Sequence, residues 1–357
     1  MSRGEHENTV KVVRLHRFGG PEALQLDEVA GVVPGAGEVS IDVAAFGLNR
    51  VEVLYREGGF GPVQFPARIG YEAAGVIAAV GEGVTNWAPG DRVAVLPGLS
   101  MERYGTYGER ILYPADMLVA VPASQSLRDA AASYMQYLTA YALISAGGIA
   151  AGDRVVITAA SSSVGLAAIQ ITRAAGATPI AVTRSRDKVQ DLYRLGAAHV
   201  VVSEEEDVAD CLRGLAPDGV DVVFDAVGGD GLLGLVSSLR SGGILILYGT
   251  LAGDAIALPA HLLMLRNLTL RGFSANAVLE DPRLRDRALT YISEGLSSGT
   301  LRPVVDRVFP LSAIGDAHRY LESNAQIGKV LVMTGGDMDS AVQLSTVANK
   351  GGSCHGG

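Results

Sequence analysis

The chain has 357 residues, a formal net charge of −9, and 48% hydrophobic against 19% charged residues. This length fits two domains of roughly 150 residues each, and the composition allows large cores. The acidic balance and the lack of a basic cluster exclude nucleic acid as a partner, because phosphate binding needs a concentrated basic face. The two cysteines, Cys211 and Cys354, exclude a disulfide framework and favour a cytoplasmic protein.

The first third of the chain alternates short β patterns with Gly/Pro turns. We expect strands at residues 10–14, 38–43, 74–80 and 91–96. Such spacing predicts a compact, partly closed β domain. The polar first residues show no apolar signal region, so we expect no export.

Residues 127–276 instead alternate strands with helices. Six strands are expected, at residues 154–158, 178–183, 199–202, 220–225, 243–248 and 268–273. This order predicts an α/β domain with a doubly wound parallel sheet. The uncharged run 155–172 is long enough to span a membrane, but three serines and a change of period indicate a protein core instead.

The last part should return to the β domain, because the parallel sheet is already complete. We expect helices at 283–297 and 314–323, an extended piece at 304–309 and a strand at 329–333. The predicted domains are therefore 1–126 with 277–335, and 127–276. The polar tail 336–357 is expected to be disordered.

The strand–turn–helix at residues 154–170 predicts a dinucleotide cofactor. Ala160, Ser162 and Gly165 occupy the positions of the G-x-G-x-x-G pattern. Small residues let the backbone approach a pyrophosphate, and the start of the helix stabilises its charge. The competing interpretation is an ordinary buried strand–helix turn.

The end of the next strand favours NADPH over NADH. Thr183, Arg184 and Lys188 occur there, and between the strand and Asp187 there is no Asp or Glu. A carboxylate at this point would hold the ribose hydroxyls of NAD, whereas Arg suits a 2′-phosphate. The alternative, that these are solvated loop charges, stays open.

The order of the parts resembles the medium-chain dehydrogenase/reductase superfamily from about Val10 to Met333, which implies a GroES-like catalytic domain beside a Rossmann domain. Seven segments carry the resemblance: 46–52 (FGLNRVE), 70–75 (GYEAAG), 80–84 (VGEGV), 89–93 (PGDRV), 139–141 (TAY), 160–165 (ASSSVG) and 225–229 (DAVGG).

Within that superfamily, the chain resembles the zinc-free quinone oxidoreductase branch. Zinc alcohol dehydrogenases have a Cys in the first segment and a His in Gly-His-Glu, where this chain has Asn49 and Tyr71. Glu72 is retained, but a catalytic zinc needs three protein ligands. The zinc-free branch has Asn and an acid near Asn49 and Glu52. No metal is therefore expected.

The resemblance also implies which residues surround the cofactor. Ser162, Ser163 and Val164 would lie against the pyrophosphate, and Arg184 and Lys188 at the 2′-phosphate. Ligands bind beyond the carboxyl ends of such strands. The remaining predicted cofactor residues are Asn49, Thr139, Thr183, Ser203, Tyr248, Gly249, Thr250, Leu251, Phe273, Ser274 and Lys329. For Lys329, a solvated strand charge is an equally open interpretation.

Without a metal, hydride transfer requires a substrate that is already electrophilic. Quinones and α,β-unsaturated carbonyls meet this requirement, and water or a tyrosine would then supply a proton. The candidate donors are Tyr55, Tyr71 and Tyr107, although for each one taken separately a packed ring with a solvated hydroxyl is the more favoured interpretation.

Three functions stay open: an NADPH-dependent quinone or enone reductase, an enoyl or other double-bond reductase of a biosynthetic pathway, and a non-catalytic NADPH-binding redox sensor. A homodimer is expected, because residues 268–273 would form an exposed edge strand, which tends to pair.

Overall fold

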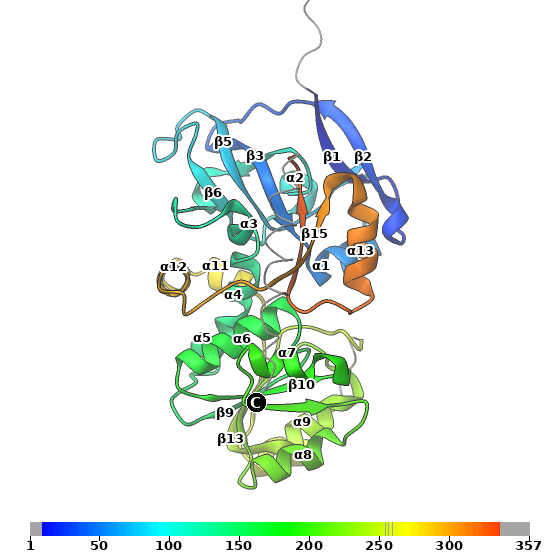
Figure 1. Ribbon diagram of the computed structural model, residues 1–357, viewed down its shortest axis with the longest axis vertical. Helices are drawn as coiled ribbons and strands as arrows, with labels where there is room; N and C mark the ends of the chain where they lie inside the picture. Colours follow the sequence, from blue (N-terminus) through cyan, green and yellow to red (C-terminus); the bar gives the residue numbers. More distant parts are fainter. Residues whose placement is uncertain (1–8, 254, 256, 259, 336–357) are drawn as a thin grey trace, which may run out of the picture.

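The computed structural model describes residues 9–253, 255, 257–258 and 260–335, and shows two domains stacked along the long axis of the molecule (Figure 1). One domain is mainly β and the other contains a six-stranded parallel sheet. The expected fold class is confirmed. The predicted disordered tail, 336–357, lies outside the described residues.

The β-rich domain is built on a seven-stranded sheet with the order β15-β16-β3-β5-β6-β8, in which β7 also pairs with β3. A smaller sheet has the order β2-β1-β4. The first eight strands are β1 (Thr9–Leu15), β2 (Leu24–Ala30), β3 (Glu38–Gly47), β4 (Ala67–Arg68), β5 (Ala73–Val80), β6 (Arg92–Val95), β7 (Arg110–Pro114) and β8 (Leu118–Ala120).

The central strand β3 shows why this sheet holds together. Val39, Ile41 and Phe46 are fully buried, so burial of apolar area stabilises its pairing on both edges. Gly75 of β5 faces this strand, and a Cβ there would meet the carbonyl oxygen of Asp42 at 2.1 Å. Only glycine allows the two strands to approach this closely.

The Rossmann domain has the strand order β11-β10-β9-β12-β13-β14, with every pair parallel. Its strands are β9 (Arg154–Ile157), β10 (Thr178–Thr183), β11 (His199–Val202), β12 (Val220–Asp225), β13 (Leu239–Leu247) and β14 (Thr269–Gly272). Its helices are α6 (Ser163–Ala174), α7 (Val189–Arg194), α8 (Val208–Leu215), α9 (Leu232–Ser238) and α10 (Ala260–Leu265).

The uncharged run 155–172 forms most of β9 and α6, and its apolar side chains lie in the hydrophobic core. The interpretation of this run as core is therefore confirmed. Across the part of the chain that the structure describes, we find no helix whose length and apolar character would let it cross a membrane.

The chain returns to the β-rich domain after β14. β15 (Val305–Pro310) pairs with β16 (Lys329–Met333), and β16 lies antiparallel to β3, with Leu331 opposite Gly47. Figure 1 shows α4, α11 and α12 between the two sheets. The helices outside the Rossmann sheet are α1 (Arg50–Arg56), α2 (Met101–Tyr104), α3 (Leu127–Ala130), α4 (Tyr134–Ala140), α5 (Ala142–Ser145), α11 (Asn276–Leu279), α12 (Pro282–Ser298) and α13 (Ile314–Glu322).

Candidate active site

The turn between β9 and α6 has the geometry of an anion-binding loop. The Ser162 hydroxyl caps the helix by accepting a hydrogen bond from the Gly165 N–H at 3.0 Å. A Cβ on Gly165 would meet the Cα and carbonyl oxygen of Ala160 at 2.6 Å, so the helix start fits closely against the turn. The N–H groups of Ser163 and Val164 have no acceptor within the helix. They are suitably placed for a pyrophosphate.

Asp225, at the end of β12, fixes the loops beside this turn. Its carboxylate accepts from the Thr158 hydroxyl at 2.5 Å and from the Gly228 N–H at 2.8 Å. The Tyr248 ring stacks on Phe224 with centroids 4.1 Å apart. The loops after β9, β12 and β13 therefore form one connected wall at the carboxyl edge of the sheet.

Cations follow β10, as the sequence predicts. Arg184 is exposed, whereas Lys188 is half-buried and donates to the hydroxyl of Ser161 at 3.1 Å and to the carbonyl oxygens of Asn324 at 2.5 Å and Gln326 at 2.9 Å. Burial and the charge of Arg184 lower the pKa of Lys188. These three acceptors are all neutral oxygens, so none of them compensates the charge of the ammonium.

The segment that precedes β16 joins the two domains at the turn. The Gly328 N–H donates to the Ser161 carbonyl oxygen at 2.8 Å, and Gly328 forms a parallel bridge with Ser162. Gly328 has a φ of 105°, a conformation that glycine adopts readily. These backbone contacts to the phosphate turn also fix the position of the next residue, Lys329.

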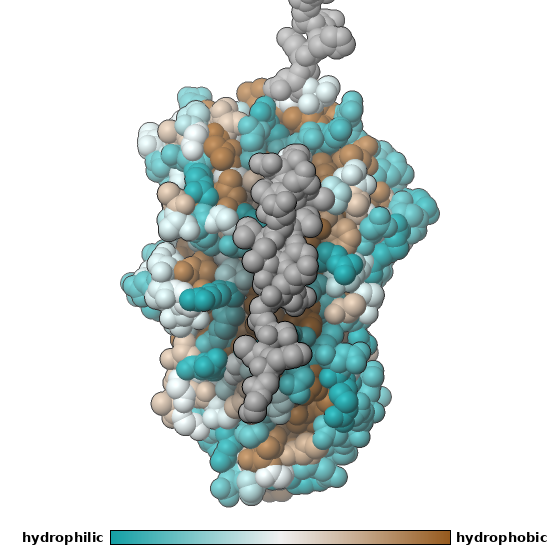
Figure 2. Space-filling model, viewed as in Figure 1, coloured by the Kyte–Doolittle hydropathy of each residue, from teal (hydrophilic) through white to brown (hydrophobic). Residues whose placement is uncertain are grey.

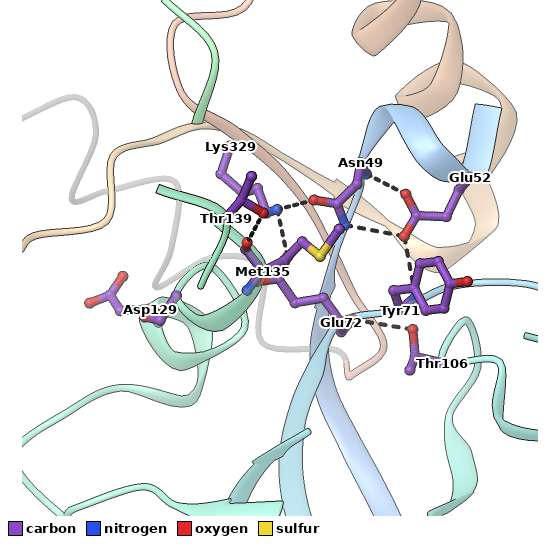
Figure 3. Close-up of polar contacts among 10 residues, drawn as sticks. Asn49, Glu52, Tyr71, Glu72, Thr106, Asp129, Met135, Thr139 and Lys329 are labelled. Atoms are coloured by element: carbon purple, nitrogen blue, oxygen red, sulfur yellow. Dashed lines mark hydrogen bonds and ion pairs between the residues drawn. The ribbon is translucent and has the colours of Figure 1, made fainter. Parts of the chain in front are cut away.

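Lys329 lies in a buried polar cluster with Glu72 and Asn49 (Figure 3). Its ammonium is 2.5 Å from Glu72 Oε2 and donates to Asn49 Oδ1 at 2.6 Å. The side chains of Lys329 and Glu72 are each only 1% exposed. The interpretation of Lys329 as a solvated strand charge is therefore wrong, because the ammonium is buried against a carboxylate.

Glu52 completes this cluster. Its carboxylate accepts from the N–H and the side-chain amide of Asn49, at 2.6 and 3.1 Å, and from the Tyr71 N–H at 3.2 Å. Burial raises the pKa of Glu52 to about 7, although the Asn49 amide and the Lys329 charge act in the opposite direction. Glu52 can therefore bind and release a proton near neutral pH.

The three candidate tyrosines differ in access. Tyr71 is half-buried, whereas Tyr55 and Tyr107 are 5% and 1% exposed. The hydroxyls of Tyr55 and Tyr107 are buried without a partner among the described residues. Tyr107 stacks on Phe46 with centroids 4.4 Å apart. Burial raises the pKa of all three, to about 12 for Tyr55. Tyr71 is the one that a substrate can reach most readily.

The other predicted cofactor residues fall into two groups. Thr139 is buried, and its hydroxyl donates to the Met135 carbonyl oxygen at 2.8 Å. The rest lie at or just beyond the carboxyl ends of parallel strands, which share one edge of the sheet: Thr183, Ser203, Tyr248, Gly249, Thr250, Leu251, Phe273 and Ser274. Figure 2 shows apolar side chains at the middle of the visible face, between the two domains.

The donor set does not fit a catalytic zinc. Among the residues that the structure describes, no three His, Cys, Asp or Glu side chains lie close enough together to hold a metal ion. Glu72, the one retained candidate ligand, is paired with Lys329. At the two positions where the zinc enzymes have Cys and His, this chain has Asn49 and Tyr71, whose side chains are an amide and a phenol.

Two features of the site were not predicted. The Glu72–Lys329 pair joins residues 257 positions apart (329 − 72), so no local pattern signals it. The buried position of Glu52 has a signal, because Asn49 and Glu52 have the N-x-x-E spacing of a capping box at the start of α1.

Two family models match this chain. A zinc-binding dehydrogenase model matches residues 195–332, and an alcohol dehydrogenase GroES-like domain model matches residues 35–123. The synaptic vesicle membrane protein VAT-1 homolog of Rattus norvegicus is 30% identical, covering 91% of this chain and 84% of that protein. The 2-haloacrylate reductase of a Burkholderia species is also 30% identical, covering 89% and 97%.

Solved structures agree with these matches. The structure of Escherichia coli quinone oxidoreductase complexed with NADPH has a TM-score of 0.84 and 28% sequence identity. The match covers 91% of this chain and 100% of the chain in that structure. A structure described as an NAD-dependent alcohol dehydrogenase has a TM-score of 0.82 and 32% identity, with coverage of 91% and 100%.

These matches, with the fold and the phosphate turn, define an oxidoreductase of the medium-chain dehydrogenase/reductase superfamily, to which the chain belongs. Within the superfamily it falls in the quinone oxidoreductase-like branch.

Proposed function

We propose that this protein is a metal-independent reductase that uses NADPH to reduce a quinone or an α,β-unsaturated carbonyl compound. The observation that carries the proposal is the buried Glu72–Lys329 pair. It puts an ammonium, held by Asn49, beside the one carboxylate that a zinc site would need. Removing that carboxylate from its partner would leave a buried charge unpaired, which is strongly unfavourable.

The cofactor proposal rests on the cations after β10. Arg184 and Lys188 have no carboxylate within ion-pair distance among the described residues. A 2′-phosphate is the part of NADPH that suits such a site, and NADH lacks it. The similar quinone oxidoreductase structure contains NADPH, whereas the similar alcohol dehydrogenase structure is described as NAD-dependent. The residues of this chain favour the former.

The substrate class follows from the chemistry of the site. When bound, NADPH supplies a hydride. Without a metal to polarise it, a simple carbonyl is a poor acceptor. The similar 2-haloacrylate reductase is named for a substrate with an activated double bond. We therefore place quinones and activated alkenes ahead of simple ketones and aldehydes.

The residues of the chain would orient the substrate and supply the proton. The amide of Asn49 is half-buried and held by Lys329 and Glu52, and it is the polar group of this cluster that we expect to contact a substrate oxygen. A fixed hydrogen-bond donor of this kind stabilises negative charge that develops on such an oxygen. Among the three candidate tyrosines, we choose Tyr71 as the proton donor because its side chain is the least buried. Its backbone N–H also donates to Glu52, which fixes the position of this residue. Catalytic roles for Tyr55 and Tyr107 stay predictions.

A turnover screen tests the proposal. Purified protein is dialysed against a chelator, its metal content is measured, and NADPH oxidation is followed with quinones, enones, enoyl thioesters and simple ketones. We expect turnover of quinones or enones that does not depend on added zinc. A matched sample with zinc restored is the control. Activity that needs stoichiometric zinc and is confined to alcohols and ketones would refute the proposal.

We also propose a homodimer formed through β14. This strand lies at the edge of the parallel sheet, all four residues are exposed, and Leu270 is 37% exposed. An exposed edge strand tends to pair with another chain. A cytoplasmic location, favoured by the cysteine content, stays a prediction.

A further inference from the structure

Cations from both domains gather around the loop that follows α13. Arg50 is the first residue of α1, in the β-rich domain, and is half-buried. Its guanidinium donates to the Leu321 carbonyl oxygen at 2.8 Å and to the side-chain oxygen of Asn324. The backbone oxygen of the same Asn324 accepts from Lys188 at 2.5 Å. One asparagine therefore ties Arg50 to Lys188.

The loop conformation makes this bridge possible. Asn324 has a φ of 58°, in the left-handed region that asparagine tolerates better than most residues. In this conformation its side chain faces Arg50 while its carbonyl oxygen faces Lys188. Gln326, two residues on, provides a second carbonyl oxygen to Lys188 at 2.9 Å. The two cations are thus held in place before any ligand is present.

Carboxylates lie near this group, Glu322 and Glu57 towards Arg50 and Asp306 towards Lys188, but no ion pair between them is formed in the described residues. In the part of the chain that the structure describes, the hydrogen-bond acceptors of Arg50 and Lys188 are neutral oxygens, and Arg184 is exposed after β10. Within the described ranges, none of the three has a carboxylate within 4.0 Å, the ion-pair limit. Glu322 lies near Arg50 but pairs with Arg56 at 2.7 Å. Arg184 lies close enough for its charge to lower the pKa of both Arg50 and Lys188. Because the positive charges of Arg50, Arg184 and Lys188 act on one another, an anion of more than one charge would be attracted to the space between them.

We propose that Arg50 is a third ligand of the 2′-phosphate of NADPH, supplied by the β-rich domain to the site that Arg184 and Lys188 begin. This inference rests on the proposed NADPH dependence. A guanidinium suits the role because it presents several N–H donors in a fixed plane, and only some of those on Arg50 are used by Leu321 and Asn324. Arg50 is then a specificity-determining residue outside the Rossmann domain.

The experiment compares NADPH with NADH on four proteins. Dissociation constants are measured by fluorescence titration for the wild type, Arg50→Gln, Arg50→Lys and Arg319→Gln. Arg319 is the matched control, because it is an exposed arginine of α13 whose ion pair among the described residues is with Asp316. Adenosine 2′-monophosphate and adenosine 5′-monophosphate, tested as competitors, isolate the adenosine end.

We expect Arg50→Gln to weaken NADPH and adenosine 2′-monophosphate by about tenfold to a hundredfold, as for one charge-assisted hydrogen bond. NADH should change less than about twofold, Arg50→Lys should recover part of the loss, and Arg319→Gln should match the wild type.

Equal weakening of NADPH and NADH would overturn the inference, because Arg50 would then act on the pyrophosphate or on the loop alone. Unchanged NADPH binding would overturn it as well. A wild type that binds both cofactors equally would instead contradict the proposed NADPH dependence. Thermal unfolding of the cofactor-free variants verifies that each is folded.

Discussion

Removal of the Lys329 ammonium should destabilise the protein strongly. In Lys329→Met, the aliphatic part of the side chain is kept while Glu72 loses a partner 2.5 Å away in a site where both side chains are 1% exposed. Breaking a buried pair in this way costs about 3–5 kcal/mol, because the remaining charge is left without compensation. Asn49 also loses the donor to its Oδ1.

The assay is urea denaturation of the cofactor-free protein, followed by tryptophan fluorescence and circular dichroism. Glu72→Gln in the same chain should restore most of the lost free energy of unfolding, since it removes the buried charge while keeping the donor–acceptor shape. Destabilisation below about 1 kcal/mol, the range of exposed ion pairs, would refute the burial argument. So would a double variant no more stable than Lys329→Met.

Three further predictions follow from other parts of the site. Arg184→Ala should weaken NADPH by about tenfold to a hundredfold and leave NADH nearly unchanged in paired titrations; equal loss for both cofactors would show that Arg184 is only a surface charge. The pKa of Glu52 is raised to about 7, above its value of about 4.3 in an unfolded chain. Its contribution to stability is therefore lost as the pH rises from about 4.3 to 7, and the free energy of unfolding of the wild type should fall relative to Glu52→Gln over that range; parallel curves would contradict this. Light scattering at micromolar concentration should give a dimer mass, and Leu270→Lys on β14 should shift it towards the monomer; a monomeric wild type would exclude the proposed interface.

The sequence predicted those parts of the fold that depend on local patterns. The six parallel strands follow from apolar runs separated by helices, and the phosphate turn from Ala160, Ser162 and Gly165 at the glycine positions. The shared carboxyl edge of the sheet then places residues such as Ser203 and Phe273 without further information. Local spacing and a parallel topology together determine where such residues lie.

The buried polar cluster could not be predicted in the same way. Lys329 lies against Glu72 and Asn49 because β16 pairs with β3, and these two strands are far apart in the sequence. Likewise, Arg50 is connected to Lys188 through Asn324, which lies in a loop of irregular conformation. Periodicity describes which face of an element is buried, but it carries no information about which distant side chains meet there.

The most direct test of the central claim is the rate of NADPH oxidation by chelator-dialysed protein in the presence of a quinone or an enone. We predict saturable turnover with NADPH, much slower turnover at equal concentrations of NADH, and zinc well below one equivalent per chain. No turnover of any quinone, enone or enoyl thioester, or activity that returns only with zinc, would contradict the account.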